Sequence, residues 1–364
     1  MKTRIPQMPI MAFFVLLLSG GNVSAAGFSS LYSFGDSLSD VGSSPFAEMS
    51  LYKRLLDNCD PFHPCGLLGP YVEGRISNGP VATEYLADSL FPGGVTGANF
   101  NSYAVAGATS GVGNYGDGGT ALELGNLLPG PIQLPIPGIL PLPGMKAELE
   151  QYMSDSNGNA DPDALYFLWG GANDYLAHEN LTTVEAARLA ARNIGGYVSE
   201  LAEAGARHFL VPNRADLSST PFVSAMGEPA KLDARTFSLE FNEELAAQLA
   251  GVSAQFPAAD IFQFDTYSFL NGVIANPLSY GFTDVQNSCL ALDCGDAGNA
   301  DSFLYWDDFH PTTYAHSVIA SAFASAVPEP EIFAMLIGGL FVLGIAASRR
   351  RELAQPCNLV EQTA

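Results

Sequence analysis

The sequence predicts an α/β protein built on a parallel β-sheet with helices on both faces. Short apolar runs that end at glycine or proline alternate along the chain with longer segments of helical spacing. Strands and helices that alternate in this way form a parallel sheet, because each helix returns the chain across a face of the sheet. Residues 27–326 are enough for one large domain of this kind.

Several short apolar segments have the composition of buried strands. The first run stops at Gly35, and the third stops just before Gly170. Open α/β sheets bind their ligands at the carboxyl ends of the strands, so the residues just after these runs are candidates for a site. We expect strands at residues 30–34, 99–105, 164–169, 207–212 and 260–264.

Other segments have the spacing of amphipathic helices. Thr182 and Glu185 form a Thr-x-x-Glu capping box, which marks the start of one helix. Pro311 stands early in the last one, where the first helical turn tolerates proline. We expect helices at residues 78–91, 182–204, 233–255 and 311–326.

The N-terminal residues 1–26 have the pattern of a secretory signal peptide. Lys2 and Arg4 precede an apolar run from Ile10 to Leu18, and small residues follow near position 26. A membrane-spanning helix is the alternative, but this run is shorter than the ~20 residues that a span needs. We therefore expect export and removal of residues 1–26.

The C-terminal residues 327–364 resemble a bacterial PEP-CTERM sorting tail. Pro328-Glu329-Pro330 is followed by an apolar segment at 332–347 and then by the basic cluster that begins at Arg349. The resemblance implies a short transmembrane segment and trimming by export and sorting machinery near Pro-Glu-Pro. The arginines would stay in the cytoplasm, with the preceding domain outside. A plain membrane anchor is the alternative.

Charge and cysteine content restrict the function further. The formal net charge of −23 argues against binding to nucleic acid or to anionic membranes. In an exported protein, two close cysteine pairs predict two local disulfides, Cys59 with Cys65 and Cys289 with Cys294. A metal site is the weaker alternative, because neither pair has the two-residue spacing of zinc ligands.

The strongest chemical signal joins two distant segments. Ser37 lies just after the first strand, and a serine needs a base to act as a nucleophile near neutral pH. His310 has Asp307 three positions before it, and one turn brings such positions together. Asp307 can then orient the imidazole while its other nitrogen accepts the Ser37 proton. Asp308 is the competing carboxylate. His208 lies inside an apolar strand and is expected to be structural.

Three groups are candidate donors to an oxyanion: the Ser37 N–H, the Gly107 N–H and the side-chain amide of Asn173. A tight turn at Gly107 and an Asx turn at Asn173 are the alternatives. The Gly-x-Gly-x-x-Gly match at 111–116 has no helix after it and does not indicate a dinucleotide site. No Gly-x-Ser-x-Gly elbow occurs, which disfavours the α/β-hydrolase class.

These segments resemble, in type and order, the SGNH hydrolase superfamily, also called the GDSL esterase/lipase family. Residues 35–38 match its first block, Gly107 its second, Gly171-x-Asn173-Asp174 its third and Asp307-x-x-His310 its last. The similarity extends over residues 30–326 and points to the secreted bacterial, plant-type branch. It implies a flavodoxin-like three-layer α/β/α fold, a Ser37–His310–Asp307 triad, and Ser37, Gly107 and Asn173 as oxyanion donors.

We therefore expect an exported serine esterase or lipase that needs no cofactor and acts on a lipid, a small ester or an acylated sugar. It would work in the periplasm, at the cell surface or outside the cell. An acyltransferase and a carbohydrate O-acetyl esterase are alternatives, and so is a non-enzymatic surface-matrix protein on the same fold. The Pro-rich apolar segment 129–144 is either a cover over an acyl-binding cleft or a packed surface loop.

Overall fold

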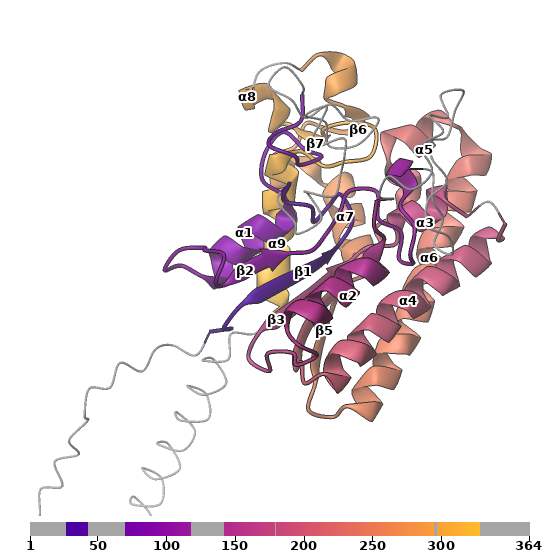
Figure 1. Cartoon of the computed structure of the whole chain (residues 1–364). Coiled ribbons are helices and arrows are strands. Elements are labelled where there is room, and N and C mark those ends of the chain that lie inside the picture. Colours follow the sequence, from indigo (N-terminus) through magenta and orange to yellow (C-terminus); the bar gives the residue numbers. More distant parts are fainter. Residues whose placement is uncertain (1–26, 43–69, 118–141, 179, 295–296, 328–364) are drawn as a thin grey trace, which may run out of the picture. The chain divides into compact units, whose positions relative to one another are not determined.

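A central sheet of five parallel strands organises the protein (Figure 1). The computed structural model describes residues 27–42, 70–117, 142–178, 180–294 and 297–327. Within these ranges the strand order is β2-β1-β3-β4-β5, which confirms the predicted parallel sheet and has the flavodoxin-like order. The strands are β1 Leu31–Gly35, β2 Phe100–Ser102, β3 Leu165–Trp169, β4 His208–Pro212 and β5 Asp260–Phe264.

Helices cover both faces of this sheet, which confirms the predicted three layers (Figure 1). On one face, apolar side chains of α2, α4 and α6 pack against β1, β3 and β4. On the other face, α1, α7 and α9 do the same. These helices are α1 Ala82–Leu90, α2 Met145–Asp155, α4 Thr183–Glu203, α6 Glu228–Gln255, α7 Thr266–Ala275 and α9 Thr313–Ala326.

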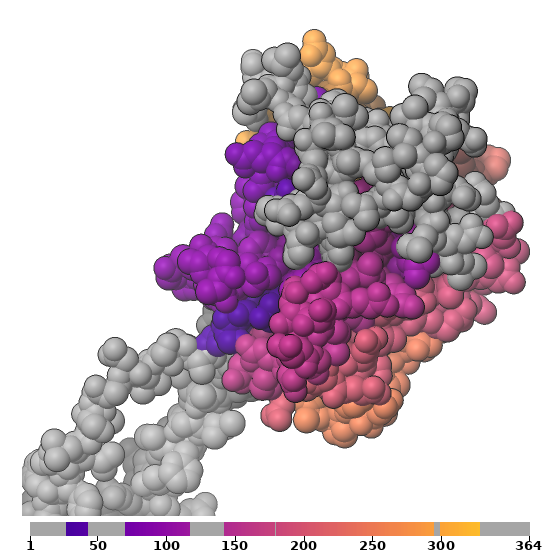
Figure 2. Space-filling view, in the orientation of Figure 1, coloured from indigo at the N-terminus to yellow at the C-terminus, as the bar shows by residue number. Residues whose placement is uncertain are grey.

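Figure 2 shows how segments that are distant in sequence meet on one side of the molecule. The violet surface formed by residues near 70–117 borders the magenta surface of the α2 region, and the pink and orange helices α4 and α6 follow. The buried residues of α2, α4 and α6 form one apolar cluster with the strands beneath them. Burial of this cluster supplies the main driving force for closing that face.

Capping side chains set the helix boundaries. Thr182 and Glu185 form the predicted capping box of α4. The last helix begins at Thr313 rather than at Pro311, because the Thr312 side chain accepts a hydrogen bond from the Ala315 N–H at 3.1 Å. The sequence placed the start of α6 at Asp233, whereas the helix begins at Glu228.

Several short elements were not predicted. A separate two-stranded parallel sheet and several short helices and turns lie beyond the main sheet and its long helices. Their runs are too short for sequence periodicity to reveal. They are β6 Asp284–Ser288, β7 Phe303–Tyr305, α3 Ala172–Leu176, α5 Pro221–Ala225, α8 Ala297–Ala300 and the 3₁₀ turns Tyr115–Asp117, Leu217–Ser219, Pro277–Tyr280 and Leu290–Leu292.

Some sequence-based expectations fall outside the described ranges. The structure joins Cys289 to Cys294 in a disulfide, whereas Cys59 and Cys65 lie in the undescribed residues 43–69. The predicted signal peptide 1–26, the apolar tail segment 332–347 and most of the Pro-rich segment 129–144 lie outside as well. Across the part of the chain that is described, every helix is too short or too polar to cross a bilayer.

Candidate active site

Three of the five predicted site residues come from the carboxyl ends of three neighbouring strands. Ser37 follows β1, Gly107 follows β2, and Asn173 lies in α3 directly after β3. The chain proceeds from β1 to β2 on one side and then crosses to β3 on the other side. Between β1 and β3 the strand order therefore reverses, and α/β sheets of this type bind their ligands in the crevice at that point.

Ser37, His310 and Asp307 form a continuous chain of contacts. The Nε2 atom of His310 lies 2.8 Å from the Ser37 Oγ. The Nδ1 atom lies 2.9 Å from Oδ1 and 2.8 Å from Oδ2 of Asp307. Ser37 is 8 % exposed and His310 is 9 % exposed, and both line the pocket. This geometry allows a proton to pass from the hydroxyl to the imidazole.

The loop that carries His310 is folded by Asp307 itself. The Oδ1 atom of Asp307 accepts hydrogen bonds from the N–H groups of Phe309 at 2.8 Å and His310 at 2.7 Å. This tight turn places the imidazole against the carboxylate three residues earlier. Asp308, the competing candidate, has an exposed side chain, and its carbonyl accepts a hydrogen bond from the Phe222 N–H at 3.1 Å. The structure therefore brings Asp307, and not Asp308, to the imidazole.

The charge state of Asp307 follows from its surroundings. Burial by itself would raise the pKa of this carboxyl. The adjacent His310 and the hydrogen bonds that the carboxylate accepts outweigh burial, and they hold the pKa of Asp307 below its usual range. Asp307 is therefore ionised across the pH range in which an enzyme works. An ionised carboxylate stabilises an imidazolium that forms beside it.

Gly107 lies in a loop that only glycine can form. Its φ is +81°, and a Cβ at this position would collide with the side-chain oxygen of Asn114. Asn114 supports the loop by donating to the carbonyl of Ala106 at 2.9 Å and accepting from the N–H of Gly116 at 2.7 Å. The Gly-x-Gly-x-x-Gly segment thus braces the Gly107 loop. Within the described residues, the Gly107 N–H has no hydrogen-bond acceptor.

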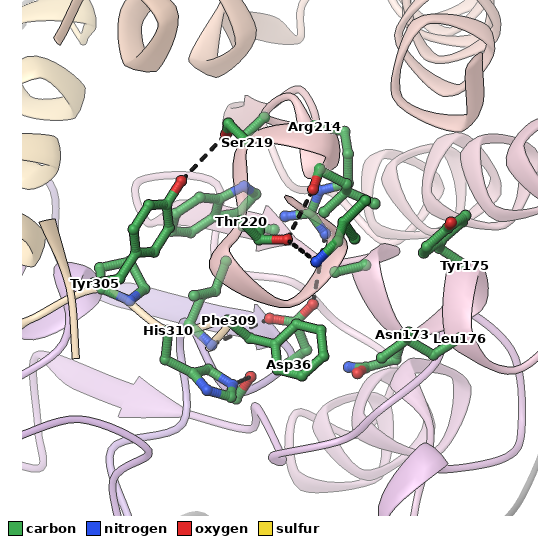
Figure 3. Close-up of a pocket in the computed structure, with 18 of the residues that line it drawn as sticks. Asp36, Asn173, Tyr175, Leu176, Arg214, Ser219, Thr220, Tyr305, Phe309 and His310 are labelled. Atoms are coloured by element: carbon green, nitrogen blue, oxygen red, sulfur yellow. Dashed lines mark hydrogen bonds and ion pairs between the residues drawn. The ribbon is translucent and has the colours of Figure 1, made fainter. Parts of the chain in front are cut away.

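Asn173 faces the same crevice from the opposite side. Gly171, with a φ of +99°, turns the chain from β3 into the short helix α3 that carries Asn173. The side-chain amide donates one hydrogen bond to the carbonyl of Ala108 at 3.0 Å. This bond fixes the orientation of the amide and leaves its second N–H for another acceptor. In Figure 3, Asn173 and His310 lie on the lower side of the same pocket.

Sequence reasoning missed the carboxylates that hold the segments of Ser37 and Gly107. Glu148 of α2 is fully buried and accepts hydrogen bonds from the N–H groups of Gly35 at 2.8 Å and Val105 at 3.2 Å. Asp40 accepts another from Ala106 at 2.8 Å. Burial raises the pKa of Glu148 well above its usual value, against the effect of the two N–H donors. An acidic residue on a helix gives no sequence signal that its partners are backbone amides.

A third buried carboxylate, that of Asp174, connects α3 to the Gly107 loop. Its two oxygens accept hydrogen bonds from the N–H of Ser110 at 2.8 Å and from the Ser110 hydroxyl at 2.7 Å. Burial raises the pKa of Asp174 to about 6, although these hydrogen bonds oppose the shift. The loop and the helix that carry two candidate oxyanion donors are therefore joined directly.

A buried ion pair involves the residue that precedes Ser37. Arg214, just after β4, is 3.6 Å from Asp36, and both side chains are almost completely buried (Figure 3). Burial raises the pKa of Asp36, and the arginine opposes this shift. The sequence offered one weak signal, a lone arginine directly after an apolar strand. The pair fixes the residue that precedes Ser37.

The pocket above Ser37 has a volume of about 130 Å³ and a mostly apolar wall (Figure 3). Polar groups also line it, among them Arg214 and the Ser219 hydroxyl, which contacts the Tyr305 hydroxyl at 3.1 Å. In the described ranges, no group of three His, Cys, Asp or Glu side chains is arranged to hold a metal ion. Apolar side chains along the wall are Tyr175, Leu176, Leu217, Val223 and Phe309.

Two other histidines make structural contacts outside the Ser37–His310–Asp307 chain. His208 contacts Asp260 at 3.3 Å and packs edge-on against Phe28, which agrees with its expected structural role. His316 is fully buried and accepts a hydrogen bond from the Ala82 N–H at 3.2 Å, so it connects α9 to α1. Burial and the nearby His310 lower the pKa of His316 to about 3. His63 lies outside the described residues.

Known proteins share this sequence pattern. The chain is 27% identical over 320 residues to a GDSL esterase/lipase of Arabidopsis thaliana, covering 80% of this chain and 87% of the relative. It is 24% identical over 356 residues to a phosphatidylcholine-sterol acyltransferase of Aeromonas hydrophila, covering 85% and 93%. An acetylajmalan esterase of Rauvolfia serpentina is 25% identical over 345 residues, covering 84% and 92%.

Among solved structures, an acetyl xylan esterase aligns with a TM-score of 0.41 and 12% identity, over 82% of this chain and 100% of that one. The model of the GDSL-like lipase/acylhydrolase family matches residues 31–323, which include every strand of the main sheet and all five candidate site residues. Because this match extends over most of its length, the chain belongs to the GDSL-like lipase/acylhydrolase family and is a serine ester hydrolase of this family.

Proposed function

We propose that the protein hydrolyses carboxylic esters through an acyl-enzyme on Ser37, with His310 as general base and acid and Asp307 as the orienting carboxylate. The observation that carries this proposal is the 2.8 Å contact between His310 Nε2 and Ser37 Oγ, continued by Nδ1 to an ionised Asp307. An imidazole held in this way has one nitrogen fixed by the carboxylate and the other turned toward the hydroxyl.

The reaction begins when the Ser37 oxygen attacks the ester carbonyl and its proton moves to His310 Nε2. Negative charge then develops on the carbonyl oxygen, where the N–H groups of Ser37 and Gly107 and the Asn173 amide donate hydrogen bonds. The C–O bond to the alcohol breaks, and the alcohol leaves with the proton from His310. Water, deprotonated by His310, then attacks the acyl-enzyme and releases the acid and free Ser37.

The substrate class follows from the pocket beside Ser37. Its wall includes Leu176, Leu217 and Phe309, which favours an ester with an apolar acyl or alcohol group. The proposed substrates are a lipid, a small ester or an acylated sugar. The named relatives include an esterase of an acetylated compound and a lipid acyltransferase. Acyl transfer to an alcohol is therefore the second candidate, with the acceptor replacing water in the last step.

A series of p-nitrophenyl esters from acetate to palmitate, with an acetylated sugar alongside, tests this proposal. We expect a burst of p-nitrophenol equal to the enzyme concentration, followed by slower turnover. A phosphonate ester reagent should add its mass to the peptide that contains Ser37, and to no other peptide. Adding glycerol or a sterol as acceptor separates the two candidates, because only a transferase yields the new ester. A folded protein that gives neither burst nor labelling is not a serine esterase.

We also propose that the hydrolase domain, residues 27–326, works outside the cytoplasm. Support comes from the sequence of residues 1–26, which has the pattern of a cleavable signal, and from the apolar and basic tail at 327–364. Mass spectrometry of the protein from its native host tests both ends. A mature N-terminus near residue 27 supports export, and a C-terminus near 326–330 supports trimming. An intact N-terminus on cytoplasmic protein contradicts the proposal.

A further inference from the structure

A tyrosine far from the catalytic loop in sequence contacts the carboxylate of that loop. The hydroxyl of Tyr71 donates a hydrogen bond to Oδ2 of Asp307 at 2.8 Å. This is the oxygen that lies 2.8 Å from His310 Nδ1. The other oxygen of Asp307 accepts from the backbone N–H groups of the loop, Phe309 and His310. The phenol and the imidazole therefore share one carboxylate oxygen.

From this contact we infer that Tyr71 is a positioning residue, which holds Oδ2 of Asp307 in line with the His310 imidazole. This role rests on the proposed function, because it has meaning only if His310 transfers protons. The backbone turn and His310 Nδ1 hold Oδ1, and Nδ1 also contacts Oδ2. The Tyr71 hydroxyl adds a hydrogen bond from a second direction at Oδ2 and so favours the rotamer in which this oxygen lies beside Nδ1. A hydrogen bond from a neutral donor to an ionised acceptor is among the stronger kinds in proteins.

The surroundings of Tyr71 fix its hydroxyl. The side chain is only 7 % exposed, and it packs in a cluster with Ile76, Trp306 and the half-cystines Cys289 and Cys294. Its backbone belongs to a turn in which Val72 and Ser77 are hydrogen-bonded at 3.1 Å. A ring that is held on all sides cannot swing its hydroxyl away from Asp307. Tyr71 thereby connects the disulfide, against which its ring packs, to Asp307, to which its hydroxyl donates.

A second bond ties the same turn to the catalytic loop. The Ser77 hydroxyl donates to the carbonyl of Pro311, the residue after His310, at 2.9 Å. Tyr71 and Ser77 therefore bind the loop before and after His310, at Asp307 and at Pro311. Two independent contacts from one short turn argue that the turn is built against the loop and does not merely touch it.

Loss of the Tyr71 hydroxyl has a predictable effect on proton transfer. The hydrogen bond spreads the negative charge of Asp307, so its removal concentrates that charge beside His310 and makes the imidazolium easier to form. The acid limb of the kcat/KM profile should then move to higher pH. Other titratable groups that face this pair are Asp36, with Arg214 behind it, and His316 on α9. They are unchanged by a substitution at Tyr71.

The test is Tyr71→Phe, assayed on a p-nitrophenyl ester as a function of pH. We expect kcat to fall about 10-fold, as loss of one such hydrogen bond implies, with KM nearly unchanged. We also expect the acid limb of kcat/KM to shift to higher pH. Tyr103→Phe is the matched control, because Tyr103 is 5 % exposed and its hydroxyl donates to Asp155 at 2.9 Å, away from the triad.

The outcomes separate positioning from plain stabilisation. If Tyr71→Phe keeps the wild-type kcat and pH profile, or if both variants lose kcat equally with no pH shift, the inference is wrong. Should Tyr71→Phe fail to fold, 3-fluorotyrosine at position 71 retains the ring and gives a stronger donor. It should move the acid limb to lower pH, and an unmoved limb overturns the inference. Absence of Ser37-dependent hydrolysis in the wild type would instead refute the proposed function.

Discussion

The segments that carry Ser37 and Gly107 differ from the loop that carries His310 in how buried carboxylates hold them. Near Ser37 and Gly107, Glu148 accepts hydrogen bonds from two backbone N–H groups, and burial raises the pKa of Glu148. In the His310 loop, Asp307 accepts hydrogen bonds from backbone N–H groups and from a tyrosine hydroxyl, and it contacts His310. The pKa of Asp307 is lowered. Both carboxylates hold backbone N–H groups in place, but only Asp307 lies beside an imidazole, which can take up a proton.

The difference teaches how one residue type serves two purposes. A carboxylate surrounded by neutral amides fixes geometry, and its charge is opposed by burial. A carboxylate next to an imidazole fixes geometry and also stabilises a developing positive charge. Substitutions that keep the shape of the side chain but remove its charge should therefore reduce kcat more at Asp307 than at Glu148.

Ser37→Ala should have the largest effect, because it removes the atom on which both sides converge. We expect loss of esterase activity by up to ~10⁶-fold with the fold preserved, as for removal of a nucleophile in other serine hydrolases. Hydrolysis of p-nitrophenyl acetate and circular dichroism measure the two quantities. An active Ser37→Ala protein would remove Ser37 from the mechanism.

Asp307→Asn tests the charge of the His310 side. The amide retains the shape but holds the imidazole in the wrong tautomer, so we expect kcat to fall by about 10⁴-fold. Asp308→Asn is the matched control, because its side chain is exposed, and it should change kcat little. A larger loss in Asp308→Asn than in Asp307→Asn would mean that the orienting carboxylate is misassigned.

Asn173→Ala tests the oxyanion side. If the Asn173 amide donates to the oxyanion, kcat should fall by about 10²–10³-fold with KM little changed. The variant also loses the bond to the Ala108 carbonyl, so its thermal stability is measured alongside. A rise in KM with unchanged kcat would assign Asn173 to substrate binding or to the turn that begins α3.

Glu148→Gln should have the smallest effect on chemistry and a clear effect on stability. The amide turns one of two acceptor oxygens into a donor that faces a backbone N–H, which costs about 1–3 kcal/mol in the free energy of unfolding. Glu150→Gln, on the exposed side of the same helix, is the control and should be nearly neutral. A Glu148→Gln protein as stable as the wild type would show that the hydrogen bonds from Gly35 and Val105 to Glu148 do not stabilise the fold.

The pH dependence of stability sharpens the same comparison. Because the folded state raises the pKa of Glu148, the unfolded chain releases that proton first as pH rises. Wild-type stability should therefore fall relative to Glu148→Gln as pH increases from the ordinary glutamate pKa of about 4.3 toward the raised value. Asp307 has the opposite sign: its stabilisation is present above the ordinary aspartate range and disappears in acid. Thermal melts across pH 3–8 distinguish the two slopes.

Local patterns explain what the sequence could predict. The five strands, the α4 capping box and the positions of Ser37, Gly107 and Asn173 depend on residues that are adjacent in the chain. The second strand was predicted too long, at 99–105, whereas β2 ends at Ser102. Beyond it, Tyr103 and Val105 still donate to the carbonyls of Ser33 and Gly35, which explains the extended pattern.

Long-range partners explain what the sequence could not predict. Glu148 meets Gly35 across 113 residues, and Tyr71 meets Asp307 across 236. A glutamate in a helix or a tyrosine in a loop has the same local pattern whether its partner is solvent or a buried amide. The helices α2, α3, α5, α7 and α8 were not predicted either. For α3, α5 and α8 the runs are too short for helical periodicity to be visible in the sequence.

The separation between Ser37 and His310 has a consequence for the timing of activity. The two residues are 273 positions apart, one after the first strand and the other just before α9. If these residues are the nucleophile and the base, as proposed, a nascent or unfolded chain holds them far apart and should have no hydrolytic activity. Closing so long a loop is slow compared with local helix formation. Recovery of esterase activity during refolding should therefore report the step that brings the segment of His310 to Ser37.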